Sequence, residues 1–264
     1  MRNVLPNASA LTPEQEAELS QRLGQWRRHP LSPEELAALL PLVQDPALAL
    51  ALGERLGMAG PDAISLLLPL CSDQGLCLPL IRALGICHHP QARDQLLRWL
   101  PEAGVLEPAV LEALACWGNQ IDLALIEHAL QAPGQAHRLA GLGLLTFRNR
   151  NLPVEQLLAL TQPLLNDLRL EVVIATLRLL QRREDPAVLE VIADCIQLDA
   201  LPGVAETAIQ ALGCIATTES CQLLIQQWPR LRATPLELPL RRQLEAQVRH
   251  RSLVAAHLAA LDPG

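Results

Sequence analysis

The chain lacks lysine and tyrosine altogether, and its aromatic residues are limited to four tryptophans and one phenylalanine. Without lysine, Schiff-base catalysis and a P-loop phosphate site are excluded. Strands favour aromatic and β-branched residues, so this scarcity argues against a β-sandwich or a nucleotide-binding sheet. The residues that dominate instead, leucine, alanine, glutamate, glutamine and arginine, all favour helices. The composition therefore predicts an all-α protein.

Excess positive charge, long apolar runs and export signals are also missing. A formal net charge of −7 argues against nucleic-acid binding, which depends on a basic surface. The longest apolar run, from Ile64 to Cys71, contains Pro69 and falls well short of the roughly 20 residues of a membrane span. Residues 1–6 are too short for a signal peptide, and residues 7–25 are polar. We expect a cytoplasmic protein whose partners include neither nucleic acid nor membrane.

Sequence motifs of catalysis and metal binding are not found either. The seven cysteines form no CxxC pair, and neither a GxSxG motif nor a glycine-rich phosphate loop occurs. We therefore expect no catalytic residue, no metal site and no cofactor. Cys87, Cys116 and Cys214 occupy nearly equivalent positions in a repeat, which predicts equivalent packing as small core residues.

What the sequence does contain is a repeated unit of an apolar helix, a short turn and a second apolar helix. The clearest copies are Leu80–Leu100, Leu111–Leu130, Thr176–Ile196 and Ala208–Trp228. Weaker copies surround Arg28, Gly57 and Arg148 in the same register, so successive copies lie 28 to 33 residues apart. A period of this length predicts an α-solenoid, in which each helical hairpin buries its apolar face against its neighbours.

The repeat also predicts the domain organisation. We expect a single repeat domain over residues 1–264, with a loose lead-in at 1–11, repeats at 12–229, and a linker and capping helix at 230–264. The capping helix is expected to run unbroken from Leu240 to Leu261. Four Xaa-Pro pairs predict helix starts with a side-chain cap, since the first residue accepts a backbone hydrogen bond and proline suits the first helical position. They are Thr12-Pro13, Ser32-Pro33, Asp45-Pro46 and Asp185-Pro186.

Two copies carry a recognisable motif. Ala83-Leu84-Gly85 with Leu96-Leu97, and Ala211-Leu212-Gly213 with Leu223-Leu224, resemble the HEAT-like repeat of phycobilisome lyase subunits and many other bacterial proteins. The likeness extends from Pro33 to Pro229. It implies a right-handed α-solenoid of about seven HEAT-like hairpins.

The family to which this resemblance points contains bilin lyases, DNA glycosylases, a metal-dependent hydroxylase and plain adaptors. The hydroxylases use paired His-Glu dipeptides, and this chain has none. The glycosylases need a basic groove with aromatic side chains, which the composition does not favour. A bilin lyase needs only a concave surface for an open-chain tetrapyrrole and arginines for its propionates. If the chain were an enzyme, this would be its activity.

Two surfaces are candidate binding sites. The turns within the hairpins are expected to align along one edge, which would gather His88, His89, Arg148, Arg150, Arg182 and Arg183. This edge could bind anions or an acidic segment, or the basic groups could simply favour the negative ends of helices.

The second helices are expected to line the concave face, where Glu190 and Asp194 would be exposed. This face could dock a partner helix or peptide, or it could be an ordinary solvated surface. Together these features predict a non-catalytic protein–protein scaffold, adaptor or assembly chaperone. Its partner would be another protein, which could bind through an acidic segment. The alternative is a bilin lyase subunit with the tetrapyrrole as its cofactor.

Overall fold

The computed structural model describes residues 10–198 and 200–261, which form α-helices and short 3-10 turns without a strand. The predicted all-α class is confirmed. The chain divides into two compact units, the first ending at Trp117 and the second beginning at Gly118. The single repeat domain stays a prediction, and most of the expected lead-in lies outside the described residues. None of the described helices is long and apolar enough to cross a bilayer.

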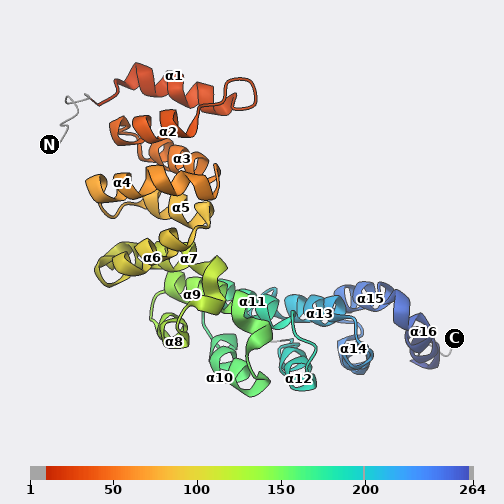
Figure 1. Ribbon diagram of the computed structural model, residues 1–264. Helices are drawn as coiled ribbons and strands as arrows, with labels where there is room; N and C mark the ends of the chain where they lie inside the picture. The colour runs from red at the N-terminus through yellow and green to blue at the C-terminus, as the bar shows by residue number, and fades with distance from the viewer. Residues whose placement is uncertain (1–9, 199, 262–264) are drawn as a thin grey trace. The chain divides into compact units, whose positions relative to one another are not determined.

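The first unit is a double layer of short helices. Helices α3, α5 and α7 pack side by side in one layer, and α2, α4 and α6 form the other (Figure 1). Across the layers, α2 packs on α3, α4 on α5, and α6 on both α5 and α7. The bounds are α1 Pro13–Gly24, α2 Pro33–Leu39, α3 Pro46–Gly57, α4 Ile64–Gln74, α5 Leu78–Cys87, α6 Pro90–Trp99 and α7 Glu107–Ala113.

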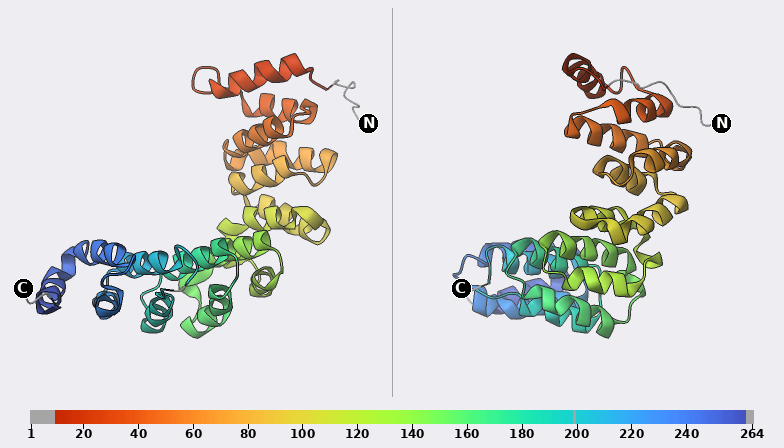
Figure 2. Two further views of the ribbon diagram at one scale, coloured as in Figure 1. Left: turned by 180° about the vertical axis from the view of Figure 1, so that it is seen from behind. Right: turned by 90° about the vertical axis from the view of Figure 1, so that its left-hand side faces the viewer.

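The second unit repeats this arrangement. Figure 1 and Figure 2 show α9, α11, α13 and α15 in one row and α8, α10, α12 and α14 in a second row. Stacking of successive hairpins in two layers is the arrangement of an α-solenoid, as predicted. Its handedness and the number of hairpins stay predictions. The bounds are α8 Leu123–Gln131, α9 Gln135–Arg148, α10 Val154–Leu165, α11 Leu170–Leu180, α12 Pro186–Asp194, α13 Val204–Ile215, α14 Thr218–Leu231, α15 Glu237–Glu245 and α16 Arg251–Leu261.

The glycine of the repeated motif lies where neighbouring helices of one layer approach closely. A Cβ atom added at Gly57 would lie 2.6 Å from the carbonyl oxygen of Ala83, and one added at Gly85 would lie 2.9 Å from the Cβ of Ala113. Both distances are shorter than packed atoms tolerate. Glycine therefore recurs at repeat spacing because a side chain there would push the helices apart.

The four predicted helix starts are confirmed, and three of them have the predicted side-chain cap. Thr12 and Ser32 each form a complete capping box, and the side chain of Asp45 accepts a hydrogen bond from the backbone N–H of Leu48 at 2.7 Å. Asp185 is the N-cap residue of α12, as predicted, but its predicted side-chain cap is wrong, because the side chain makes no hydrogen bond to the helix. Its carboxylate pairs instead with the guanidinium of Arg183 at 2.6 Å, a contact that the Xaa-Pro pattern does not reveal.

The unbroken C-terminal helix is also a wrong prediction. Helix α15 ends at Glu245, a 3-10 turn spans Val248–His250, and α16 begins at Arg251. Gln247 leaves the helical conformation with ψ of 69°. Its buried side-chain amide donates a hydrogen bond to the carbonyl of Gly213 at 2.9 Å. This contact with the preceding repeat accompanies the break, and the amphipathic pattern contains no sign of it.

Candidate functional site in a groove between helices α10 and α12

Two arginines of the predicted cationic edge bind backbone carbonyls of their own chain. The guanidinium of Arg148 donates a hydrogen bond to the carbonyl of Ile121 at 2.5 Å. That of Arg183 donates to the carbonyls of Asn149 at 2.6 Å and Leu152 at 3.0 Å. Carbonyls beyond a helix end lack an intrahelical donor, and the guanidinium groups supply one. These two side chains are therefore engaged within the fold.

Arg150 and Arg182 are the exposed members of the same turns. Within the described part of the chain, neither guanidinium has a hydrogen-bond or ion-pair partner. Of the four predicted edge arginines, these two are therefore the ones that remain for an external anion. Arg183 instead lowers the pKa of Asp185 from its usual 3.8, chiefly through their hydrogen bond.

The two predicted histidines shape the turn between α5 and α6. His88 is the left-handed C-cap of α5, with φ of 53°, and its imidazole stacks on the indole of Trp117 with ring centroids 5.0 Å apart. His89 is the N-cap of α6, and its Nδ1 accepts a hydrogen bond from the backbone N–H of Gln91 at 3.2 Å. The histidines belong to the first unit and the four arginines to the second, so their common edge stays a prediction.

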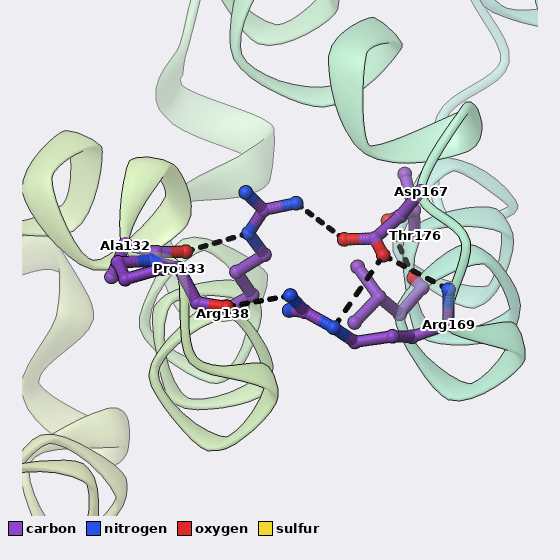
Figure 3. A network of polar contacts seen from close by, with 7 residues as sticks. Ala132, Pro133, Arg138, Asp167, Arg169 and Thr176 are labelled. Atoms are coloured by element: carbon purple, nitrogen blue, oxygen red, sulfur yellow. Dashed lines mark hydrogen bonds and ion pairs between the residues drawn. The ribbon is translucent and has the colours of Figure 1, made fainter.

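A polar network that the sequence analysis missed joins two loops of the second unit (Figure 3). Asp167 accepts hydrogen bonds from the guanidinium of Arg138 and from the backbone N–H of Arg169, and its side chain is only 3% exposed. Arg138 also donates to the carbonyl of Ala132 at 2.7 Å, and Arg169 donates to that of Pro133 at 2.5 Å. The network ties the α8–α9 loop to the α10–α11 loop. No local motif indicates it, because its partners come from separate repeats.

The candidate site is a groove of about 690 Å³ between the last turns of α10 and α12 and the start of α13. Its apolar wall consists mainly of Leu165, Val173, Val191, Leu201 and Val204. The side chains of Gln162, Asn166, Asp194 and Gln197 add polar groups. Asp194 is thus a predicted site residue that the structure places in a groove. Glu190, four positions earlier on α12, is exposed but does not line it.

The charge in this groove is negative. Asp194 is the charged residue among its described lining residues, and its side chain is exposed. Burial and then the charge of Asp194 raise the pKa of the neighbouring Cys195 thiol to about 11. The site can therefore offer a carboxylate and amide groups beside an apolar wall. Asp199 lies outside the described residues.

The cysteines follow the predicted core positions only in part. Cys87 is buried, and its thiol donates to the carbonyl of Gly60 at 3.3 Å, whereas Cys116 is half-buried. Cys214 is exposed, so its predicted place in the core is wrong. Equivalent positions in the repeat are therefore not equally buried by neighbouring residues. Among the described residues, no three His, Cys, Asp or Glu side chains gather as a metal-binding group.

Comparisons with known proteins returned no match for this chain among family models, curated proteins or solved structures.

Proposed function

We propose that this chain is a non-catalytic interaction scaffold, of the adaptor or assembly-chaperone kind, that binds a segment of a partner protein in the α10–α12 groove. The observation that carries the proposal is the open apolar wall beside Asp194. Leu201, in the loop between α12 and α13, is 42% exposed in this wall. Exposed apolar surface rimmed by polar groups is typical of interaction sites. A groove of this size suits a few side chains of a docked segment.

Two other proposals receive less support. An acidic partner segment would have Arg150 and Arg182 available, since Arg148 and Arg183 are hydrogen-bonded within the fold. A bilin would need free arginines for its propionates, whereas the groove carries a carboxylate. The bilin-lyase alternative, the HEAT-like family and the cytoplasmic location all remain predictions.

The test is capture of a partner by the full chain with an open or a filled groove. Ala159 is exposed and lines the groove, so Ala159→Trp would fill it without changing its charge. Ala187 is exposed on α12 but does not line the groove, so Ala187→Trp is the matched control. Each variant and the unmodified chain would be used for affinity capture from native lysate, with quantitative mass spectrometry.

We expect a stoichiometric partner with the unmodified chain and with Ala187→Trp, and its loss with Ala159→Trp. Equal capture by all three proteins would rule out this groove as the site. Capture of no protein by the unmodified chain would overturn the scaffold proposal. An absorption scan of the eluate tests the alternative, because a bilin would add a visible band.

A further inference from the structure

We infer that the α10–α12 groove takes an arginine or lysine side chain of the partner segment, flanked by an apolar residue. This inference rests on the proposed function and names the chemistry of its partner. Its first support is charge complementarity. Asp194 carries the one formal charge among the described lining residues, and it is exposed to an incoming group. A cation is attracted to this carboxylate, whereas an acidic group is repelled.

Two of the three helix ends at the groove have the same polarity as Asp194. The groove lies at the C-terminal ends of α10 and α12, which finish at Leu165 and Asp194. The last carbonyls of a helix lack intrahelical donors and carry negative partial charge, which favours a nearby cation. The start of α13 at Val204 has the opposite polarity. Two helix C-termini and one carboxylate therefore favour a cation against this single N-terminus.

A proline in α10 leaves a backbone carbonyl of the groove without its usual hydrogen-bond donor. Pro163 lies inside α10 and has no N–H, so the carbonyl of Ala159 lacks the hydrogen bond that residue 163 would normally donate. Both residues line the groove. A ligand that donates hydrogen bonds could satisfy this carbonyl together with the carboxylate of Asp194. Arginine and lysine are donors without acceptor atoms, and arginine presents five N–H groups.

The apolar wall explains why the ligand is a side chain of a peptide and not a bare cation. Val173, Val191 and Leu201 lie beside these acceptors. Arginine and lysine carry an aliphatic stem that packs on apolar surface while the charged head stays in water or pairs with a carboxylate. The remaining apolar surface would be covered by an adjacent apolar residue of the segment. A purely apolar segment would bury Asp194 and the carbonyls without donors, which costs free energy.

The probe is a pair of synthetic fluorescein-labelled peptide pools. Both carry a fixed leucine and randomised uncharged residues, and next to the leucine one pool has arginine where the other has glutamate. Binding to the full chain is measured by fluorescence anisotropy at low salt. We expect the arginine pool to bind at least about tenfold more tightly, a preference that added salt weakens.

Two charge reversals on one helix give the decisive comparison. Asp194→Arg reverses the charge inside the groove, and Glu190→Arg makes the same change outside it. Asp194→Arg should invert the preference between the pools, whereas Glu190→Arg should leave the arginine pool preferred. Ala159→Trp should weaken the binding of both pools.

Three results would overturn the inference: equal binding of the two pools, preference for glutamate, or a preference that Asp194→Arg leaves unchanged. Binding of neither pool by the unmodified chain would overturn it as well. The scaffold proposal would survive each result as long as partner capture still depends on Ala159. If capture from lysate does not depend on Ala159, the proposed site fails for any partner.

Discussion

The guanidinium of Arg183 donates a hydrogen bond to the backbone carbonyl of Asn149, 34 positions earlier in the chain. The same separation of 34 positions recurs in three further contacts of the second unit. They join Arg230 to the carbonyl of Ile196, Gln247 to that of Gly213, and His250 to that of Ala216. Each carbonyl lies at or near a helix end, where intrahelical donors run out. In each case a side chain of one repeat thus binds a backbone carbonyl of the repeat before it.

Removal of Arg183 should destabilise the protein. Its side chain is 12% exposed and donates to two carbonyls and to the carboxylate of Asp185. In Arg183→Ala these acceptors lose their donor, so we expect the free energy of unfolding to fall by about 2 kcal/mol. Urea unfolding followed by circular dichroism measures the change. The control is Arg182→Ala, whose exposed side chain has no hydrogen-bond or ion-pair partner in the described part of the chain. It should change stability by at most about 0.5 kcal/mol. Equal losses in both variants would contradict the structural role of Arg183.

Acid should weaken the network around Asp167. Burial by itself would raise the pKa of this carboxyl, but hydrogen bonds from the backbone of Arg169 and the guanidinium of Arg138 outweigh it. The pKa therefore lies below its usual 3.8. A group with a lowered pKa in the folded state stabilises the fold above the pKa of the unfolded state. This stabilisation is lost as the pH falls through the folded-state pKa.

The measurement is the thermal midpoint between neutral pH and about pH 2, compared with Asp167→Asn. The amide cannot ionise, so this variant should be less stable at neutral pH and should lose less on acidification. Asp194→Asn is the control at an exposed carboxyl, and its profile should follow that of the unmodified chain. If Asp167→Asn and the unmodified chain lose stability in parallel, the carboxylate is not the acid-sensitive group.

The close approach of helices at Gly57 should not tolerate a methyl group. In Gly57→Ala the new Cβ would lie 2.6 Å from the carbonyl oxygen of Ala83, so α3 and α5 must separate. We expect a loss of about 1–3 kcal/mol, as for other overpacked sites. Gly24→Ala is the matched change in α1, where the new Cβ would meet no atom within 4 Å beyond its own stretch of helix. It should be neutral or stabilising by up to about 1 kcal/mol. A stabilising Gly57→Ala would refute the packing argument.

The thiols should react in an order set by exposure and pKa. Burial raises the pKa of Cys71 to about 12, and that of Cys195 lies at about 11, so neither forms much thiolate near neutral pH. Cys214 is exposed. We expect iodoacetamide to modify Cys214 first in the folded protein, and Cys71 and Cys195 only after unfolding. Peptide mapping by mass spectrometry gives the order. Early modification of Cys71 would contradict its burial.

The candidate site was predictable from sequence only in part. The expectation of exposed carboxylates on second helices identified Asp194, because a polar residue in an amphipathic helix faces outward. It could not separate Asp194 from Glu190, since only the packing of α10, α12 and α13 decides which carboxylate lines a groove. The basic turns were also predictable from the sequence. That Arg148 and Arg183 are hydrogen-bonded within the fold was not, because their acceptor carbonyls lie about one repeat away in the chain.

The sequence by itself determined the all-α class, the repeat period and the four tested helix starts. These features depend on local residues: apolar spacing along a helix and a capping side chain beside a proline. The tertiary structure decided where Asp185 pairs, where the C-terminal helix breaks, which cysteine is exposed and which carboxylate meets an apolar groove. The last three depend on packing partners that folding brings from elsewhere in the chain, whereas the partner of Asp185 is the nearby Arg183, which is itself held by the carbonyl of Asn149. A local pattern does not contain these distant partners.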